Sequence, residues 1–246
     1  MSSVRKRWRV AALAALGGVA ILGIAWAAWR GALCCVPNFY AEAVAVPASA
    51  YQEAGEALER NVLALHHEVQ EKAVWSTVIT DDQVNGWLAV DLPEKFPQLL
   101  PAEIQDPRVA FQTDRLQLAC RFSSPQWTSV VSVALEVRLA EEPNTLAVRI
   151  RGARAGLIPL PLTRLLEHIT AAAQRVDVPL RWAQVEGDPV AMLTIVELSP
   201  LEDGTQPQLE RIEVREGELH LVGHTVSVAN DPVSTSRVET PRAPRM

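Results

Sequence analysis

The stretch Val131-Ser-Val-Ala-Leu-Glu-Val-Arg-Leu139 decides the fold class of this chain. Every second residue is apolar, and Ser132, Glu136 and Arg138 lie between the apolar positions. Successive side chains of a β-strand point to opposite faces of a sheet. The pattern therefore predicts a strand with one packed face and one face in water.

Further strands are predicted on both sides of this stretch. Their signals are alternation or short apolar runs at residues 75–79, 109–111, 116–122, 146–151, 180–185, 190–198, 209–214 and 218–224. Short connections, such as Glu141-Glu-Pro-Asn144, favour antiparallel neighbours. The tight turn Arg215-Glu-Gly217 predicts a hairpin, because glycine accepts positive φ. We expect one curved antiparallel sheet.

Three amphipathic helices are predicted around the sheet. Apolar residues recur every 3.6 positions over residues 50–71, with Ser49 as a candidate cap. A second, shorter helix follows Thr80-Asp-Asp82 and ends before Pro93, Pro97 and Pro101, which keep the next stretch irregular. The third covers residues 162–176 after Gly156-Leu-Ile-Pro-Leu-Pro161. Strands before and after a packed helix indicate the α+β class.

The N-terminal region carries the strongest localisation signal. Residues 10–29 contain no charge, and Arg5, Lys6, Arg7 and Arg9 precede them. Twenty helical residues span about 30 Å, the thickness of the hydrocarbon core. Interfacial tryptophans are expected at Trp8, Trp26 and Trp29.

Basic residues on the N-terminal side predict a single-pass anchor in the cell (inner) membrane, with the N-terminus cytoplasmic and the C-terminal domain outside. A cleaved signal peptide is the alternative, although its apolar region is usually shorter. A C-terminus shielded from protease in intact cells would contradict the anchored topology.

This topology divides the chain into five parts. They are a basic N-terminus (1–9), a transmembrane helix (10–29), a tether (30–48), an exported α+β domain (49–228) and a disordered tail (229–246). The chain has 23 Lys and Arg against 29 Asp and Glu, and five basic but no acidic residues precede position 31. The remainder therefore has a formal charge of −11, which disfavours nucleic acid as a partner.

Few side chains suggest chemistry. Three cysteines are too few for a disulfide framework. Cys34 and Cys35 could cross-link two copies or take an acyl chain, or be inert, whereas Cys120 fits a core strand. His66 and His67 with Glu71, and His220 with His224, could hold a metal, but solvated faces explain both pairs better. Known catalytic and phosphate-binding loops are absent, so neither catalysis nor a cofactor is predicted.

The apolar surplus suggests a candidate groove between sheet and helix. Its lining would be Val131, Val133, Leu135 and Val137 from the strand and Leu162, Leu165, Leu166 and Ile169 from the helix. A lipid tail could occupy such a groove. Simple core packing of the same residues is the alternative.

Two motifs resemble a known family. Thr80-Asp-Asp-Gln-Val-Asn85 is similar to the Thr-x-x-x-(Leu/Val)-Asn helix start of the YpmS-like family of membrane-anchored extracytoplasmic proteins. Gly156-Leu-Ile-Pro-Leu-Pro161 is similar to the Gly-x-Leu-Pro-x-Pro turn of that family. The resemblance covers residues 75–178 and the closing hairpin, but the proline-rich residues 91–107 depart from it. It implies an anchored α+β domain and brings no catalytic residue.

These observations favour a non-enzymatic, membrane-anchored exported domain that binds a lipid tail or an envelope partner. Residues 10–29 would contact the bilayer, and a membrane protein is a possible second partner. A structural or assembly protein of the envelope is the alternative function, and a hydrolase with an unrecognised site is the third.

Overall fold

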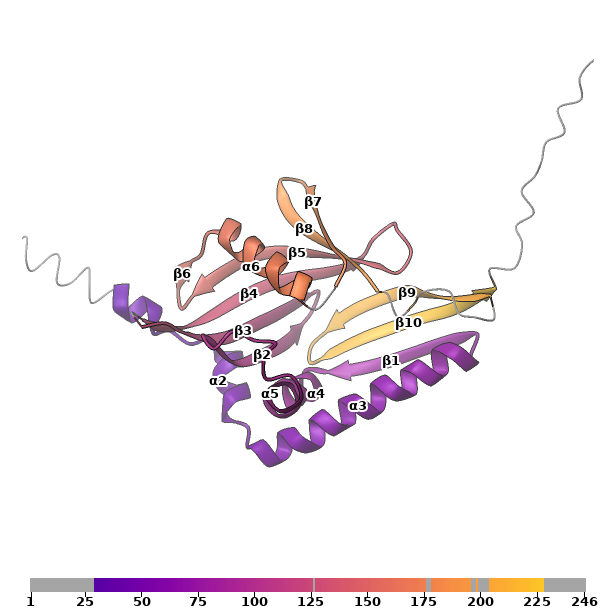
Figure 1. Cartoon of the computed structure of the whole chain (residues 1–246), viewed down its shortest axis with the longest axis horizontal. Helices are drawn as coiled ribbons and strands as arrows, with labels where there is room; N and C mark the ends of the chain where they lie inside the picture. The colour runs from indigo at the N-terminus through magenta and orange to yellow at the C-terminus, as the bar shows by residue number, and fades with distance from the viewer. Residues whose placement is uncertain (1–28, 126, 176–177, 196–197, 199–203, 228–246) are drawn as a thin grey trace, which may run out of the picture.

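The computed structural model describes residues 29–125, 127–175, 178–195, 198 and 204–227. These residues form an α+β fold with antiparallel sheets, as predicted, but with two sheets in place of one (Figure 1). Residues 1–28 and 228–246, which include most of the predicted anchor and the predicted tail, lie outside the described residues. Within the described part of the chain, no helix is both long and apolar enough to cross a bilayer.

The larger sheet contains residues 131–139. Its strands follow the order β2-β3-β4-β5-β8-β7, and the two-residue β6 pairs with β5. Their bounds are β2 (Ile104–Gln112), β3 (Arg115–Ser123), β4 (Thr128–Leu139), β5 (Thr145–Ala155), β6 (Ile158–Pro159), β7 (Leu180–Val185) and β8 (Asp188–Thr194). The strand β4 is confirmed, with Val133 opposite Ala153 and Leu135 opposite Ile150, but the predicted solvent face is not, because Ser129 and Val130 are buried as well as Val133.

The smaller sheet joins strands that are far apart in the sequence. Its order is β1-β10-β9, with β1 (Val74–Thr80), β9 (Thr205–Arg215) and β10 (Glu218–Ser227). The predicted hairpin between β9 and β10 is confirmed, and Gly217 has φ +73°. The prediction of a single sheet was wrong because β1 pairs with the last strand and not with a neighbour of β2.

The long helix α3 (Ala48–Glu71) covers the smaller sheet. Val69 of this helix shares a buried cluster with Trp75 and Leu209. The helix was predicted from residue 50, but the residue before its first turn is Pro47, so Ser49 is not the cap. Val62, one of the apolar residues that recur along this helix, is half exposed.

The helical segment after β1 is longer than predicted. It comprises α4 (Asp81–Gly86), the π-helical turn η1 (Trp87–Asp91) and α5 (Leu92–Lys95). Thr80 forms the predicted N-terminal cap, since its hydroxyl accepts from the Gln83 backbone N–H and the Gln83 side chain accepts from the Thr80 N–H. Pro93 does not stop the helix because it stands in the first turn of α5, where its missing N–H is not needed.

Residues 30–48 are not a simple tether. The helix α2 (Asn38–Ala45) lies within them, and the Tyr40 side chain is buried against Ala119 and Val130 of the large sheet. The Ser129 hydroxyl donates a hydrogen bond to the Leu33 carbonyl at 2.7 Å. This segment therefore packs onto the sheet from residue 33 onward.

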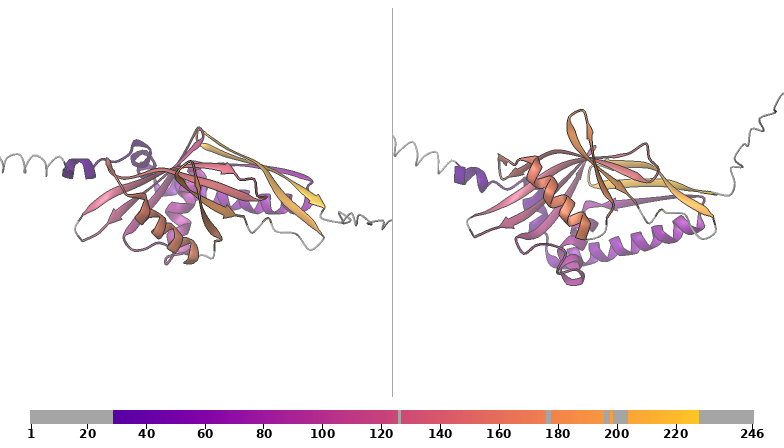
Figure 2. Two further views of the ribbon diagram at one scale, coloured as in Figure 1. Left: turned by 90° about the horizontal axis from the view of Figure 1, so that it is seen from above. Right: turned by 45° about the horizontal axis from the view of Figure 1, so that its top comes forward.

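The opposite face of the large sheet is covered by α6 (Leu162–Arg175), the predicted amphipathic helix. Figure 2 shows α6 crossing the strands at an angle. Because α2 and α6 pack on different faces, both sides of β4 contribute to apolar clusters.

Candidate functional site

The described surface has a hollow beside α5, called the α5 pocket below. Its volume is about 410 Å³, within the range of small-molecule sites. It lies between the helical segment η1–α5 and the edge strand β2, and α5 and β2 are labelled in Figure 1. The lining residues are Leu88, Ala89, Leu92, Pro93, Phe96, Pro97, Leu100, Pro101, Ala102, Ile104, Gln105, Asp106, Pro107 and Arg108.

Two contacts hold the helical wall of the pocket in place. The buried Asn85 side chain donates to the Val109 carbonyl at 2.9 Å and accepts from the Val109 N–H at 2.7 Å. A Cβ at Gly86 would come within 2.5 Å of the Tyr51 carbonyl oxygen, so glycine permits this close approach of α3. Asn85, the last residue of the Thr80–Asn85 motif, therefore has a structural role.

Residues 92–101 form the outer wall of the pocket, and they carry a repeated sequence pattern that was not among the predicted sites. Apolar-proline pairs recur every four residues, at Leu92-Pro93, Phe96-Pro97 and Leu100-Pro101. All six residues line the α5 pocket. Prolines stiffen the irregular chain, and the residue before each one faces the hollow. Phe96 is half exposed and its ring lies 6.1 Å from that of Trp87.

The floor of the pocket is an irregular part of β2. The register with β3 shifts between Gln105 and Arg108, and Asp106 has φ +48°. Such bulges redirect side chains at the edge of a sheet. Asp106 forms an ion pair with Arg121 of β3 at 3.3 Å, which neutralises its charge.

Arg108, next to this bulge, is the unusual residue of the site. Its side chain is 6% exposed, its Nε has no hydrogen-bond partner, and its Nη1 donates to the Pro107 carbonyl at 2.7 Å. Its Cζ lies 5.2 Å from the centre of the Tyr51 ring. Among the described residues, no carboxylate oxygen lies within 4.0 Å of the guanidinium. A buried charge without a counter-ion is costly, and the face of the Tyr51 ring offsets part of this cost.

A second buried polar atom belongs to Tyr40, which packs against Ala119 and Val130 of the large sheet and does not line the α5 pocket. The Tyr40 hydroxyl has no hydrogen-bond partner, and the residue is 3% exposed. Burial raises the pKa of Tyr40, Asp106 adds to the rise, and Arg121 and Arg108 oppose it. Because its pKa is raised, the Tyr40 hydroxyl stays protonated at neutral pH.

The predicted groove residues lie elsewhere, on β4 and α6. Leu162, Leu166 and Ile169 pack with Val133 and Leu135 in one apolar cluster. Val131 and Val137 are partly buried on the same strand, and the Leu165 side chain is outside the described part. None of the other seven lines the α5 pocket. Of the predicted interfacial tryptophans, Trp29 is 53% exposed, and Trp8 and Trp26 fall outside the described residues.

The histidines suggested as metal ligands are not brought together. His66 and His67 are exposed on α3, and the His66 ring contacts Gln70. His220 pairs with Glu218 at 2.7 Å and His224 with Glu210 at 3.6 Å. Within the described ranges, no group of three or more His, Cys, Asp or Glu is placed to hold a metal.

The cysteines differ in their exposure. Cys34 and Cys35 are exposed and carry free thiols. Burial raises the pKa of Cys120 to about 11, so its thiol is poorly reactive at neutral pH.

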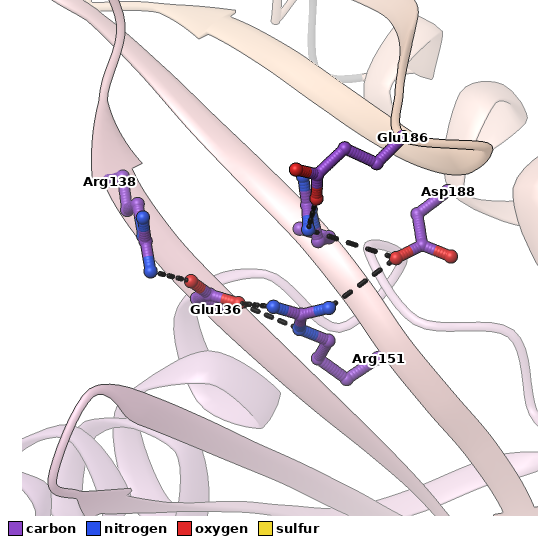
Figure 3. A network of polar contacts seen from close by, with 6 residues as sticks. Glu136, Arg138, Arg151, Glu186 and Asp188 are labelled. Atoms are coloured by element: carbon purple, nitrogen blue, oxygen red, sulfur yellow. Dashed lines mark hydrogen bonds and ion pairs between the residues drawn. The ribbon is translucent and has the colours of Figure 1, made fainter.

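A charged network on the large sheet has a structural role (Figure 3). Glu136 accepts from Arg151 at 2.5 Å and also pairs with Arg138. Arg151 and Arg149 both reach Asp188 in the β7–β8 hairpin, at 3.4 and 3.8 Å. The network therefore links β4, β5 and β8.

This network predicts an acid-dependent loss of stability. Burial raises the pKa of Glu136, but hydrogen bonds and charges from Arg151 and Arg138 outweigh it and hold the pKa below its usual range. The pKa of Glu136 in the folded state is thus below the unfolded value of about 4.3. The ionised Glu136 therefore contributes to the free energy of unfolding above that pH, and this contribution is lost as the pH falls through the folded pKa. We expect Glu136→Gln to flatten the fall in unfolding free energy below pH of about 4.5, measured by urea denaturation. Glu141→Gln, at an exposed position, is the control, and parallel curves for wild type and Glu136→Gln would contradict the prediction.

Comparisons with known proteins found no match. No family model matches the chain, and neither curated proteins nor solved structures give a match.

Proposed function

We propose that this chain is a non-catalytic binding protein that holds the hydrocarbon tail of a lipid in the α5 pocket. The observation that carries the proposal is the apolar lining of this hollow, supplied by leucines, prolines and Phe96 on one side and Ile104 on the other. Sites for apolar ligands have this size and composition. The α5 pocket is a different surface from the predicted groove between β4 and α6, but the proposed ligand, a lipid tail, is the same.

A second part of the proposal concerns the membrane. Residues 10–29 would form the anchor, with the N-terminus cytoplasmic and the domain outside. Support comes from the segment that follows the anchor, which is attached to the large sheet. The Ser129 hydroxyl donates a hydrogen bond to the Leu33 carbonyl, and the backbone of Ala32 and Leu33 lies so close to Gly156 that a side chain there would collide with it. The folded domain would therefore begin within a few residues of the bilayer, which gives the α5 pocket access to lipids.

Photolabelling tests the binding of a hydrocarbon tail. The full chain in lipid nanodiscs is exposed to decanol bearing an alkyl diazirine, and labelled peptides are identified by mass spectrometry. We expect labelling within residues 88–104. Ala102→Trp should reduce it severalfold because a bulky ring would fill the hollow from its exposed rim.

Ala64→Trp is the matched control for this experiment. Ala64 is exposed on α3 and does not line the α5 pocket, so labelling of residues 88–104 should be unchanged. Equal labelling in wild type and Ala102→Trp, or no labelling of these residues, would reject the proposed function.

A further inference from the structure

We infer that the domain docks on an anionic bilayer through one end of the large sheet, called the docking rim below, which consists of residues 29–36, 127–130 and 154–159. This inference rests on the membrane attachment in the proposed function, and it adds the surface by which the domain faces the lipid. The docking rim surrounds the point where the described chain begins, directly after the predicted anchor (Figure 1).

Two hydrogen bonds bring the three segments of the docking rim together. The Ser129 hydroxyl donates to the Leu33 carbonyl at 2.7 Å, and the Leu157 N–H donates to the Ala32 carbonyl at 2.8 Å. The start of β4 and the turn after β5 are therefore fixed against the residues that follow the predicted anchor.

The docking rim exposes large apolar side chains. Leu157, in the turn between β5 and β6, is 61% exposed, and Trp29 is 53% exposed. They are neighbours, because Trp29 lies one helical turn before Ala32, which is bonded to Leu157. Trp127, directly before β4, is partly exposed. Single exposed apolar residues are ordinary, but a group that includes two tryptophans beside a membrane anchor fits the interface of a bilayer.

The charge of the docking rim is opposite to that of the chain as a whole. Residues 29–41, 121–135 and 152–161 contain no Asp or Glu, whereas the whole chain has 29 Asp and Glu against 23 Lys and Arg. Within these segments Arg30 and Arg154 are exposed. Anionic phospholipids attract arginines that lie close to the membrane surface.

The position of the carboxylates fixes the orientation of the docked domain. Glu141 and Glu142 are exposed in the turn between β4 and β5, at the opposite end of these strands, where an anionic surface would repel them. On β2, Asp106 is paired with Arg121 at 3.3 Å, and Glu103 is exposed at the β2 edge of the sheet, away from β5. The ends of β4 and β5 that carry the docking rim therefore face the lipid.

This orientation gives a lipid tail a short route to the α5 pocket. Ile104, which lines the pocket, is opposite Phe122 of β3. The next residue of β3, Ser123, is opposite Thr128 at the start of β4. The β2 side of the pocket and the docking rim are therefore at the same end of the large sheet.

Quenching by lipid nitroxides tests the inference in the full chain. The fluorophore NBD is attached to Leu157→Cys or, at the opposite end, to Glu141→Cys, both in a background with Cys34→Ser and Cys35→Ser. Burial raises the pKa of Cys120 to about 11, so this thiol reacts poorly at neutral pH. In nanodiscs that contain phosphatidylglycerol and nitroxide-labelled acyl chains, we expect quenching to be at least about threefold stronger at position 157 than at position 141.

Two comparisons separate docking from mere closeness to the anchor. Quenching at position 157 should fall severalfold when phosphatidylglycerol is replaced by phosphatidylcholine, and Arg154→Glu should cause a similar fall in phosphatidylglycerol, because the anionic surface repels the new carboxylate. Arg115→Glu is the matched control, since Arg115 is exposed at the opposite end of β3, and it should leave the quenching unchanged. Near-ultraviolet circular dichroism checks that both variants are folded.

The outcomes separate this inference from the proposed function. Equal quenching at the two positions, or quenching at position 157 that does not depend on phosphatidylglycerol, overturns the docking and leaves the anchor and the α5 pocket intact. Blue-shifted NBD emission at position 157 without quenching by the nitroxides would assign the docking rim to a second copy of the chain, and it also overturns the inference. Failure of the chain to float with vesicles after carbonate extraction would refute the proposed anchor, and the inference with it. The lipid comparison needs no charge variant, so it decides the matter even if Arg154→Glu does not fold.

Discussion

Replacing Asn144 by alanine is expected to lower the free energy of unfolding by about 3–5 kcal/mol. The Asn144 side chain is 4% exposed and donates to the carbonyls of Leu198 and Pro207 at 3.0 and 2.8 Å. It also accepts from the Leu209 N–H at 2.8 Å. Alanine would leave three buried backbone groups without this partner, and it would be strained at the φ of +53° found here.

Two further substitutions separate these effects. Asn144→Gly accepts positive φ and loses only the hydrogen bonds, so it should be less destabilised than Asn144→Ala by about 1 kcal/mol. Asn144→Asp keeps the acceptor but places a carboxylate oxygen against two carbonyl oxygens, and we expect a loss comparable to that of alanine. Urea denaturation followed by tryptophan fluorescence measures all three. A loss below about 1 kcal/mol for Asn144→Ala would show that water replaces these bonds.

Asn144 matters because it connects the two sheets. It lies in the turn between β4 and β5 of the large sheet, and its partners Pro207 and Leu209 belong to β9 of the small sheet. Leu139 and Leu146, at the same end of this hairpin, pack on the cluster that contains Trp75 and Leu209. The junction thus combines apolar packing with one amide that fixes the relative position of the strands.

Replacing Gly223 by alanine is expected to cost at least about 3 kcal/mol, at the upper end for overpacked sites. A Cβ at this position would lie 2.0 Å from Cζ2 of Trp75 and 2.5 Å from the Gln208 carbonyl oxygen. Trp75 is opposite Gly223 in the β1–β10 pairing and is 3% exposed, so its ring has little space to move. Thermal and urea unfolding should both show the loss.

Gly152→Ala is the matched control for Gly223→Ala. Gly152 also lies in a strand beside a register shift, but a Cβ there would have no atom within 4 Å. Its stability should change by no more than about 0.5 kcal/mol. If Gly223→Ala is as stable as Gly152→Ala, Trp75 has another position available, and the described packing of the small sheet is wrong.

The stability of this region bears on the α5 pocket. Asp81, at the start of α4, accepts from the Phe111 N–H of β2 at 3.3 Å, and the Gly217 carbonyl of the β9–β10 turn accepts from the Asp81 N–H at 3.1 Å. The helical wall of the pocket is therefore attached to both sheets. A variant that loosens the small sheet is expected to disturb ligand binding indirectly, so stability must be measured beside every binding variant.

The sequence by itself determined the local elements of this protein. Alternation in residues 131–139 gave β4, the 3.6-residue period gave α3, and Thr80 with Gln83 gave the cap of α4. Each depends on neighbours within a few residues, where strand and helix geometry alone decide which side chains share a face. For the same reason, the turn at Gly217 could be placed from its residues.

Only the tertiary structure decided how these elements combine. Periodicity shows that a face is apolar but not which other face covers it, so the division into two sheets and the packing of Tyr40 on the large sheet were missed. The α5 pocket likewise depends on the bulge at Asp106 and on the clamp from Asn85 to Val109, which join residues 24 positions apart. Burial of Arg108 could not be predicted, because a charged residue in a strand ordinarily indicates the solvent face, and only contacts between distant segments reverse that expectation.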